Sequence, residues 1–215
     1  MSRFDPFRRA ALRATLALVT AAIAAGAALA QPASPAEELA GPALLAALRA
    51  GGYIIYFRHT STDFGQNDDQ MTGYEDCSSQ RNLTDGGRDE ARAIGAAFAD
   101  LHIPVGDVLA SPFCRTMETA RLMFGRAQAT PAVRGGPANS EGGRYQELKD
   151  LLTKRVTRGA NLVIASHGNP FRAVVGGPYL AEGEAAVIDP LGERGFRVVA
   201  RVTKDRWRAL AARGA

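Results

Sequence analysis

Three short apolar segments of this sequence each lead into a residue that can bind or attack an anion. Arginine side chains bind phosphate oxygens through two parallel hydrogen bonds, and a neutral imidazole nitrogen is a competent nucleophile near neutral pH. Brought together in one crevice, these groups would suit a phosphate dianion, with an imidazole placed to attack phosphorus. The groups are Arg58 and His59 after residues 53–57, Arg115 in the turn after residues 108–110, and His167 after residues 162–165.

The segments that carry these groups alternate with stretches of helical periodicity. The compact apolar runs are typical of buried strands, and strands that alternate with helices predict an α/β fold, a three-layer αβα sandwich with a mostly parallel central sheet. In such sheets ligands bind beyond the carboxyl ends of the strands. The expected helices cover residues 39–48, 84–100, 112–124, 141–157 and 169–175, two further strands cover 185–188 and 196–202, the latter a half-exposed edge strand, and residues 60–81 form a long polar loop.

Four motifs, in this order, resemble those of the histidine phosphatase superfamily, which includes the cofactor-dependent phosphoglycerate mutases and bacterial phosphohistidine phosphatases. The resemblance covers most of residues 53–203 and implies a phosphoglycerate mutase-like fold. Thr60 takes the place of a glycine, and segment 129–143 is short and rich in glycine. The motifs are Arg58-His59-Thr60, Leu83-Thr84-x-x-Gly87-x-x-x-Ala91, Ser111-Pro112-x-x-Arg115-Thr116-x-x-Thr119-Ala120 and Ser166-His167-Gly168.

The resemblance implies a metal-independent phosphatase without a cofactor, acting on a small phosphorylated substrate. His59 would attack the phosphoryl group and become phosphohistidine. Arg58, Arg115 and His167 would hold the equatorial oxygens as charge builds up in the transition state. The substrate would be a phosphomonoester or a phosphoramidate. Two alternatives stay open: a phosphotransferase of the phosphoglycerate mutase type, and a non-catalytic module that binds phosphate or a phosphorylated ligand.

The resemblance also implies a carboxylic acid that protonates the leaving oxygen and then activates water. Glu141 has close to the family's spacing from Arg115, and Glu184 follows His167 just before a predicted strand. Each also has a plain structural explanation: Glu141 as a glutamate favoured at a helix N-terminus, and Glu184 as a solvated carboxylate in a turn. The sequence leaves both glutamates open as the acid. A phosphoramidate would need neither of them, because its leaving nitrogen is protonated without an acid from the protein.

Four further residues are candidate substrate contacts. Thr60 would narrow the pocket, because it is larger than the glycine of the family. Arg81 and Asn82 end the long loop and either contact the substrate or serve the loop's own hydrogen bonds. Thr116 either donates a hydrogen bond near the phosphate or caps a helix. The acidic residues of the loop either select cationic substrates or form a solvated rim; they are Asp63, Asp68, Asp69, Glu75 and Asp76.

Cys77 and Cys114 are the only cysteines of the chain. One lies in the long loop and the other beside Arg115, so both are expected at the same end of the sheet. In an exported chain such a pair predicts a disulfide, which would contribute roughly 3–4 kcal/mol in the chain-entropy model. A cysteine nucleophile of the tyrosine-phosphatase type is excluded, because neither cysteine is followed by arginine after five intervening residues.

The first thirty residues have the pattern of a secretory signal peptide. Arg8, Arg9 and Arg13 precede an apolar stretch over residues 14–30 that ends in Ala28-Leu29-Ala30. We expect a cleaved signal over residues 1–30, a linker over 31–36, one domain over 37–215, and a periplasmic or secreted protein; an uncleaved anchor is the alternative. The net charge of +4 falls to +1 without residues 1–30, so nothing in the composition calls for a nucleic-acid partner.

Overall fold

The computed structural model describes residues 38–135 and 143–214. Six strands form one sheet in the order β3-β2-β4-β1-β5-β6. β3, β2, β4 and β1 run parallel, and β5 and β6 run antiparallel to their neighbours. This confirms the predicted α/β fold with a mostly parallel sheet, and β6 is an edge strand as expected. The strands are β1 (Ile54–Arg58), β2 (Val105–Ala110), β3 (Gln128–Ala129), β4 (Asn161–Ser166), β5 (Ala185–Pro190) and β6 (Phe196–Val202).

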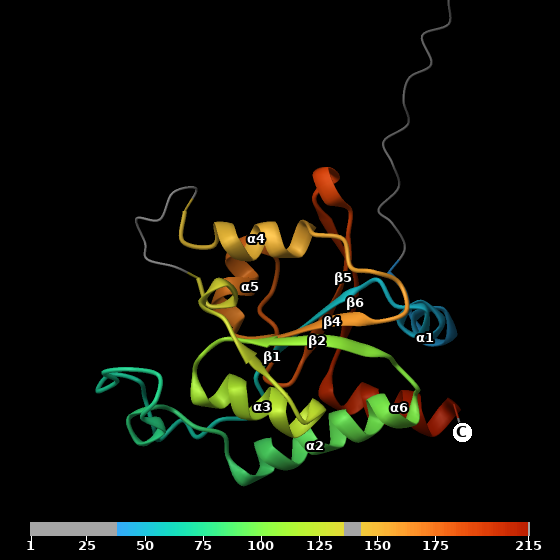
Figure 1. The fold of residues 1–215 in the computed structure, drawn as a ribbon. Helices are drawn as coiled ribbons and strands as arrows, with labels where there is room; N and C mark the ends of the chain where they lie inside the picture. Colours follow the sequence, from blue (N-terminus) through green and yellow to red (C-terminus); the bar gives the residue numbers. More distant parts are fainter. Residues whose placement is uncertain (1–37, 136–142, 215) are drawn as a thin grey trace, which may run out of the picture. The chain divides into compact units, whose positions relative to one another are not determined.

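Helices cover both faces of this sheet (Figure 1). The strand β1 shows why, because its apolar side chains alternate between the faces: Ile55 and Phe57 belong to one core cluster, Ile54 and Tyr56 to the other. A fully buried strand of this kind needs an apolar layer on each side. The first cluster packs against α1 (Gly41–Ala50), α2 (Asp85–Asp100), α3 (Cys114–Phe124) and α6 (Lys204–Gly214), and the second against α4 (Gln146–Thr153) and α5 (Gly168–Val175).

Most predicted helices have the expected bounds to within two residues, and the exceptions have local causes. Thr84 caps α2 as its sequence predicts, since its Oγ1 accepts a hydrogen bond from the N–H of Gly87 at 2.9 Å. The helix predicted over 141–157 is shorter, because Lys154 adopts an extended backbone after α4. The two-residue strand β3 was not predicted, since so short a segment has no periodicity. No helix among the described residues is long and apolar enough to cross a bilayer.

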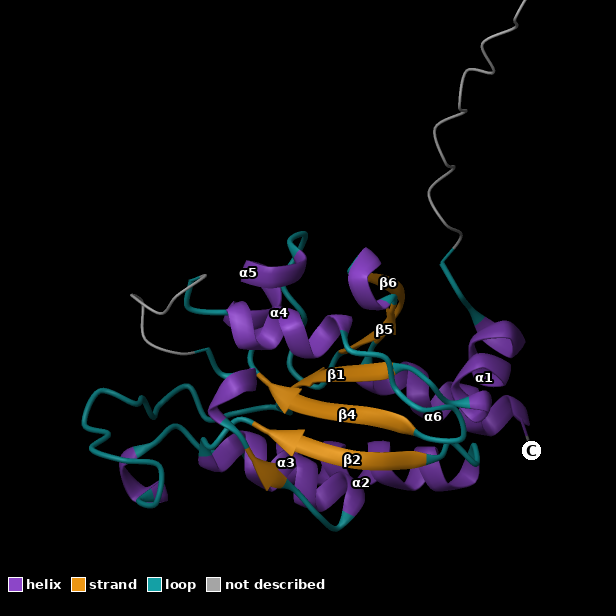
Figure 2. Cartoon of the chain, turned by 45° about the horizontal axis from the view of Figure 1, so that its top comes forward, coloured by secondary structure: helices purple, strands orange, loops and turns teal. Residues whose placement is uncertain are grey.

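The carboxyl ends of β1, β4 and β2 lie side by side. Arg58 is paired with Ser166, and Ala110 with Ala165, so the three strands end at the same level. In Figure 2 their arrows point the same way. The predicted phosphate-binding groups lie at or after the ends of these three strands. The topology therefore places all of them at the same end of the sheet.

Candidate active site

Arg58 and His59 lie where the chain leaves β1. Residues 54–57 have no exposed surface, and β1 is paired on both sides, with β4 and with β5. The backbone N–H of His59 donates to Ser166 at 3.0 Å, and only 2% of His59 is exposed. The sheet therefore fixes the position of the imidazole.

The His59 ring is held as one neutral tautomer. Its Nδ1 lies 2.9 Å from the carbonyl oxygen of Thr60. A carbonyl oxygen only accepts, so Nδ1 carries the proton and Nε2 keeps a free lone pair. Burial lowers the pKa of His59 to about 3; the hydrogen bond to Thr60 opposes this effect, and the charges of Arg115 and Arg58 add to it. An unprotonated Nε2 is the form in which histidine acts as a nucleophile.

The turn between β2 and α3 carries Arg115 into the same place. Thr116 holds this turn, because its buried Oγ1 lies 2.7 Å from the carbonyl of Ser111 and 2.8 Å from that of Phe113. The Arg115 guanidinium lies over the Phe113 ring, with Cζ 4.4 Å from the ring centroid, and only 5% of Arg115 is exposed. Thr116 thus stabilises the turn before α3 but does not cap the helix, whose N-cap is Phe113, and it does not line the pocket.

His167 follows β4 and completes the group. Its ring centroid is 5.6 Å from that of His59, and its Nε2 lies 2.9 Å from Oγ of Ser111. Burial, followed by the charge of Arg115, lowers the pKa of His167 well below its usual value. The hydrogen bond to Ser111 fixes the orientation of the His167 ring beside His59.

These side chains line one cavity of about 380 Å³. Five arginines reach it, against a single carboxylate among the described lining residues, Asp68. Such an excess of guanidinium groups favours a multiply charged oxyanion. The lining residues are Arg58, His59, Asp68, Arg81, Phe113, Arg115, Arg134, Arg144, Tyr145, His167, Gly168, Asn169, Pro170 and Tyr179. Arg134 and Arg144 were not predicted, because they follow β3, the short strand that was itself not predicted.

Glu182, another residue that was not predicted, supports Arg58 and His59 from behind. Its Oε1 accepts from Nη2 of Arg58 at 3.3 Å and from Oγ1 of Thr62 at 2.7 Å, and it lies 3.9 Å from Nδ1 of His59. The turn that carries it is tied to β1, because Gly183 N–H donates to the carbonyl of His59 at 2.9 Å. In the sequence only its nearness to Glu184 pointed to it.

Glu184, one of the two candidate acids, points elsewhere. Its carboxylate pairs with Arg201 of β6 at 2.8 Å and 3.0 Å and accepts from Ala181 N–H at 2.7 Å. It does not line the cavity. This geometry favours a structural ion pair over the catalytic role suggested for Glu184. The other candidate, Glu141, lies outside the described residues.

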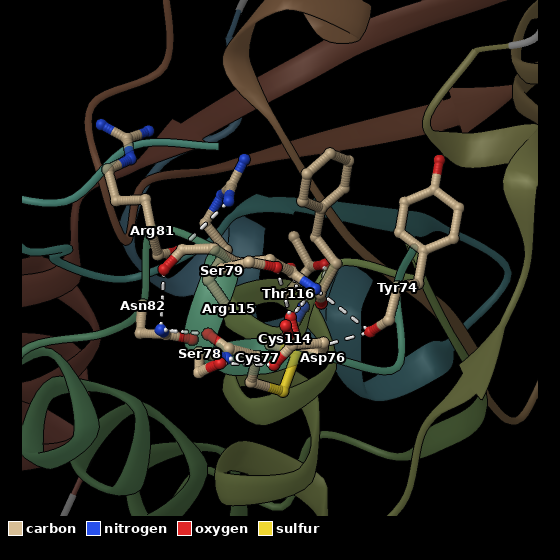
Figure 3. Close-up of a disulfide and its surroundings, with 12 residues drawn as sticks. Tyr74, Asp76, Cys77, Ser78, Ser79, Arg81, Asn82, Cys114, Arg115 and Thr116 are labelled. Atoms are coloured by element: carbon tan, nitrogen blue, oxygen red, sulfur yellow. Dashed lines mark hydrogen bonds between the residues drawn. A yellow bond between two sulfur atoms is a disulfide. The ribbon is translucent and has the colours of Figure 1, made fainter. Parts of the chain in front are cut away.

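The remaining candidate contacts divide. Arg81 lines the cavity. The Asn82 amide donates to the carbonyls of Cys77 at 2.7 Å and Gln80 at 2.8 Å, so it serves the loop; Figure 3 shows it beside Cys77. Thr60 is fully buried, and its Oγ1 lies 3.3 Å from Oγ1 of Thr119 on α3. Thr60 does not line the cavity, so this geometry does not favour the expected narrowing of the pocket by its side chain.

The Cys77–Cys114 disulfide ties the long loop to the start of α3 (Figure 3). Next to it, the side chain of Gln80 accepts from the N–H of Cys114 at 3.0 Å and donates to the carbonyl of Tyr74 at 3.1 Å. The predicted disulfide is confirmed. The loop is thereby attached one residue away from Arg115.

Gly87 explains one of the motif positions. A Cβ on this residue would lie 2.0 Å from the carbonyl oxygen of Ser61, so only glycine lets α2 pack against the segment that follows His59. The start of α2 thus acts as a support for the segment behind the imidazole.

Comparison with known proteins agrees with this geometry. The family model described as histidine phosphatase superfamily (branch 1) matches residues 54–152. The solved structure of the protein histidine phosphatase SixA with tungstate is similar, with a TM-score of 0.51 at 18% identity, over 71% of this chain and 97% of that one. A proposed α-ribazole-5′-phosphate phosphatase from Escherichia coli K-12 gives 0.50 at 15% identity, over 72% and 98%. A search of curated proteins found no match.

Residues 54–152 thus match the histidine phosphatase superfamily (branch 1), and the chain has the histidine phosphatase fold. The matched segment ends before His167, which the sheet topology brings to the site. At these identities the solved structures establish the fold, and what they bind remains a property of those proteins.

Proposed function

We propose that the chain is a phosphatase that hydrolyses phosphomonoesters or phosphoramidates through a phosphohistidine on His59. The observation that carries this proposal is the convergence of a neutral His59 with Arg58, Arg115 and His167 on one cavity. The lone pair of Nε2 forms a bond to phosphorus while the bond from phosphorus to the leaving group breaks. Water then attacks the phosphohistidine, which releases orthophosphate and restores the imidazole.

The charge of the transferring group would be stabilised by the arginines. Preorganised donors aimed at developing charge are worth on the order of 10²-fold or more in rate each, so Arg58→Ala and Arg115→Ala should each lower kcat/KM by at least about that factor. The proposed reaction uses no metal ion and no cofactor. Activity in the presence of EDTA tests this directly.

The leaving oxygen of a phosphomonoester also needs a proton donor. Glu141 is the proposed donor: it stands in the chain between Arg134 and Arg144, which both line the cavity. Hydrolysis of a phosphoramidate would proceed without Glu141. Glu141→Gln should therefore slow hydrolysis of an alkyl phosphate far more than that of a phosphoramidate, whereas equal slowing of both would contradict this role.

The nucleophile is tested by a pair of matched variants. Phosphate release from an aryl phosphate should fall on the order of 10³-fold or more in His59→Asn. The control is His102→Asn, because His102 lies outside the cavity and has a positive φ of 53° that asparagine tolerates. Rapid-quench labelling should give an acid-labile, alkali-stable phosphoenzyme that His59→Asn lacks. Tight phosphate binding without turnover in the unaltered protein would favour a binding module instead, and transfer in place of hydrolysis would favour the mutase type.

We also propose that the protein is exported. The signal-like pattern over residues 1–30 and the disulfide both support this, since disulfides persist in oxidising compartments. N-terminal sequencing of the mature protein should start at Gln31. An intact Met1 on protein from the cytosolic fraction would contradict export.

A further inference from the structure

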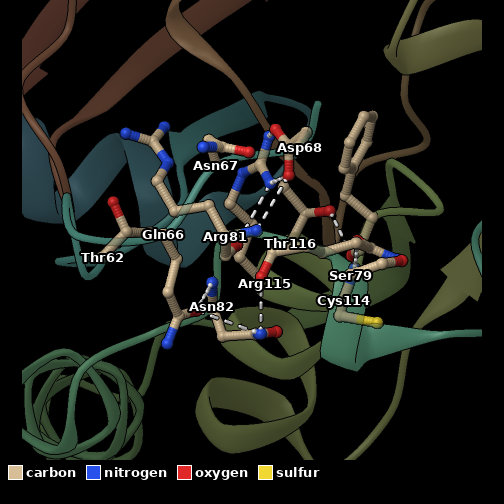
Figure 4. A network of polar contacts seen from close by, with 12 residues as sticks. Thr62, Gln66, Asn67, Asp68, Ser79, Arg81, Asn82, Cys114, Arg115 and Thr116 are labelled. Atoms are coloured by element: carbon tan, nitrogen blue, oxygen red, sulfur yellow. Dashed lines mark hydrogen bonds and ion pairs between the residues drawn. The ribbon is translucent and has the colours of Figure 1, made fainter. Parts of the chain in front are cut away.

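The long loop after β1 places a carboxylate on one of the phosphate-binding arginines. Oδ1 and Oδ2 of Asp68 accept from Nη1 and Nη2 of Arg115 at 2.9 Å and 3.0 Å, and Oδ1 also accepts from the backbone N–H of Arg81 at 2.9 Å. Figure 4 shows the carboxylate facing the guanidinium. A phosphoryl group can bind to a pair of parallel N–H donors of this kind.

Arg115 also has contacts that do not involve Asp68. Its Nη1 also donates to the carbonyl of Arg81 at 3.2 Å, its guanidinium lies against Phe113, and its neighbour Cys114 is held by the disulfide. The side chain of Asp68 is 32% exposed, against 6% for that of Arg115. Asp68 is therefore the partner that can leave.

We propose that Asp68 is an intramolecular occupant of the phosphate position, which exchanges with the phosphoryl group of the substrate. This inference rests on the proposed function, because it requires that the cavity binds phosphoryl groups. Carboxylate and phosphoryl oxygens cannot both take the two N–H donors of Arg115. Asp68 thereby lowers the affinity of the cavity for every anion by one common factor. Only anions that the rest of the cavity binds strongly will displace Asp68 from Arg115.

The protonation state of Asp68 suits this role. Partial burial raises its pKa, but the hydrogen bonds from Arg115 and from the N–H of Arg81 outweigh that effect and hold the pKa below its usual value. The carboxylate is therefore charged, and present as a competitor, throughout the physiological range.

The experiment is a calorimetric titration with two probes of the same shape. Phenylphosphonate is doubly charged at mildly alkaline pH, and benzenesulfonate is singly charged; neither can be hydrolysed. The proteins are the unaltered chain, Asp68→Asn, Asp68→Ala and the control Asp69→Asn. Asp69 is an exposed neighbour, so its variant makes the same charge change outside the cavity.

We expect Asp68→Asn and Asp68→Ala to bind both probes more tightly by the same factor. This factor is about tenfold if Asp68 is bound to Arg115 in about 90% of the unaltered molecules. Asp69→Asn should stay within about twofold, because exposed charges are screened. Thermal unfolding checks that each variant is folded, and either Asp68 variant suffices for the test.

Three results would overturn the inference while leaving the phosphate site intact. One is unchanged or weaker binding in the Asp68 variants, which would make Asp68 a positioning residue for Arg115. Another is a gain in affinity that is much larger for the doubly charged probe, which would mean that Asp68 repels anions by its charge without occupying their position. The third is an equal gain in Asp69→Asn. If the unaltered protein and every variant bind neither probe, the proposed function itself fails.

Discussion

Removal of the Cys77–Cys114 disulfide should lower stability chiefly through the unfolded chain. The bond joins residues 37 apart, for which the chain-entropy relation gives about 4 kcal/mol. That is a large share of the roughly 5–15 kcal/mol by which domains are stable. Contacts of the folded loop, such as the hydrogen bonds of Gln80 to Cys114 N–H and Tyr74, involve no sulfur atom. The variant should therefore still fold and keep Arg115 in place.

The assay is urea unfolding of the double variant Cys77→Ser/Cys114→Ser beside the oxidised protein. With a slope of about 2 kcal/mol per molar urea, the midpoint should fall by about 2 M. Unaltered protein under reductant should match the double variant, which itself should not respond to reductant. A loss below about 1 kcal/mol would refute the entropic reasoning. A much larger loss, or complete unfolding, would show that the loop's folded contacts depend on the bond.

Three further predictions concern the supports of the site. Burial holds the pKa of both His59 and His167 well below the unfolded value, so the unfolded chain binds more protons than the folded chain as pH falls below about 6.5. Each histidine should lower the unfolding free energy by roughly 1–2 kcal/mol between about pH 6.5 and 5, and His59→Asn should remove one of these two contributions. Gly87→Ala, whose Cβ would meet a backbone carbonyl at 2.0 Å, should cost about 1–3 kcal/mol and slow turnover, whereas Gly86→Ala, with its nearest neighbour at 3.7 Å, should leave stability unchanged or raise it. Glu184→Gln breaks the pair with Arg201 and should cost about 2 kcal/mol with kcat changed only a few-fold; a loss of about 10²-fold or more in kcat would restore Glu184 as the acid.

The sequence was most informative where periodicity and strand ends agree. The runs around Phe57, Ala110 and Ala165 predicted three strands, and parallel order alone brought Arg58, Arg115 and His167 to one edge. Two cysteines near that edge were enough to predict their bond. These inferences depend on local pattern plus one topological rule, which is why they succeeded.

What sequence could not settle depends on side-chain direction within turns. Glu182 and Glu184 are two residues apart, yet one supports Arg58 and the other pairs with Arg201. Asp68 looked like any other acidic residue of a polar loop until the loop was folded back onto Arg115. No periodicity operates in such segments, because their conformation is set by contacts that are distant in sequence.

The Phe113 ring has a consequence for how a ligand arrives. It lies 4.4 Å from Cζ of Arg115 and 5.3 Å from that of Arg134, and so it supports two guanidinium groups without cancelling their charge. A carboxylate in its place would hold both but would remove much of the field at the cavity mouth. With the aromatic support, the field of Arg134, and that of Arg115 once Asp68 has left it, extends into solvent and draws anions in over about a Debye length, roughly 10 Å at 0.1 M salt. Added salt should therefore slow the capture of a phosphorylated ligand more than it shortens the time that the ligand stays bound.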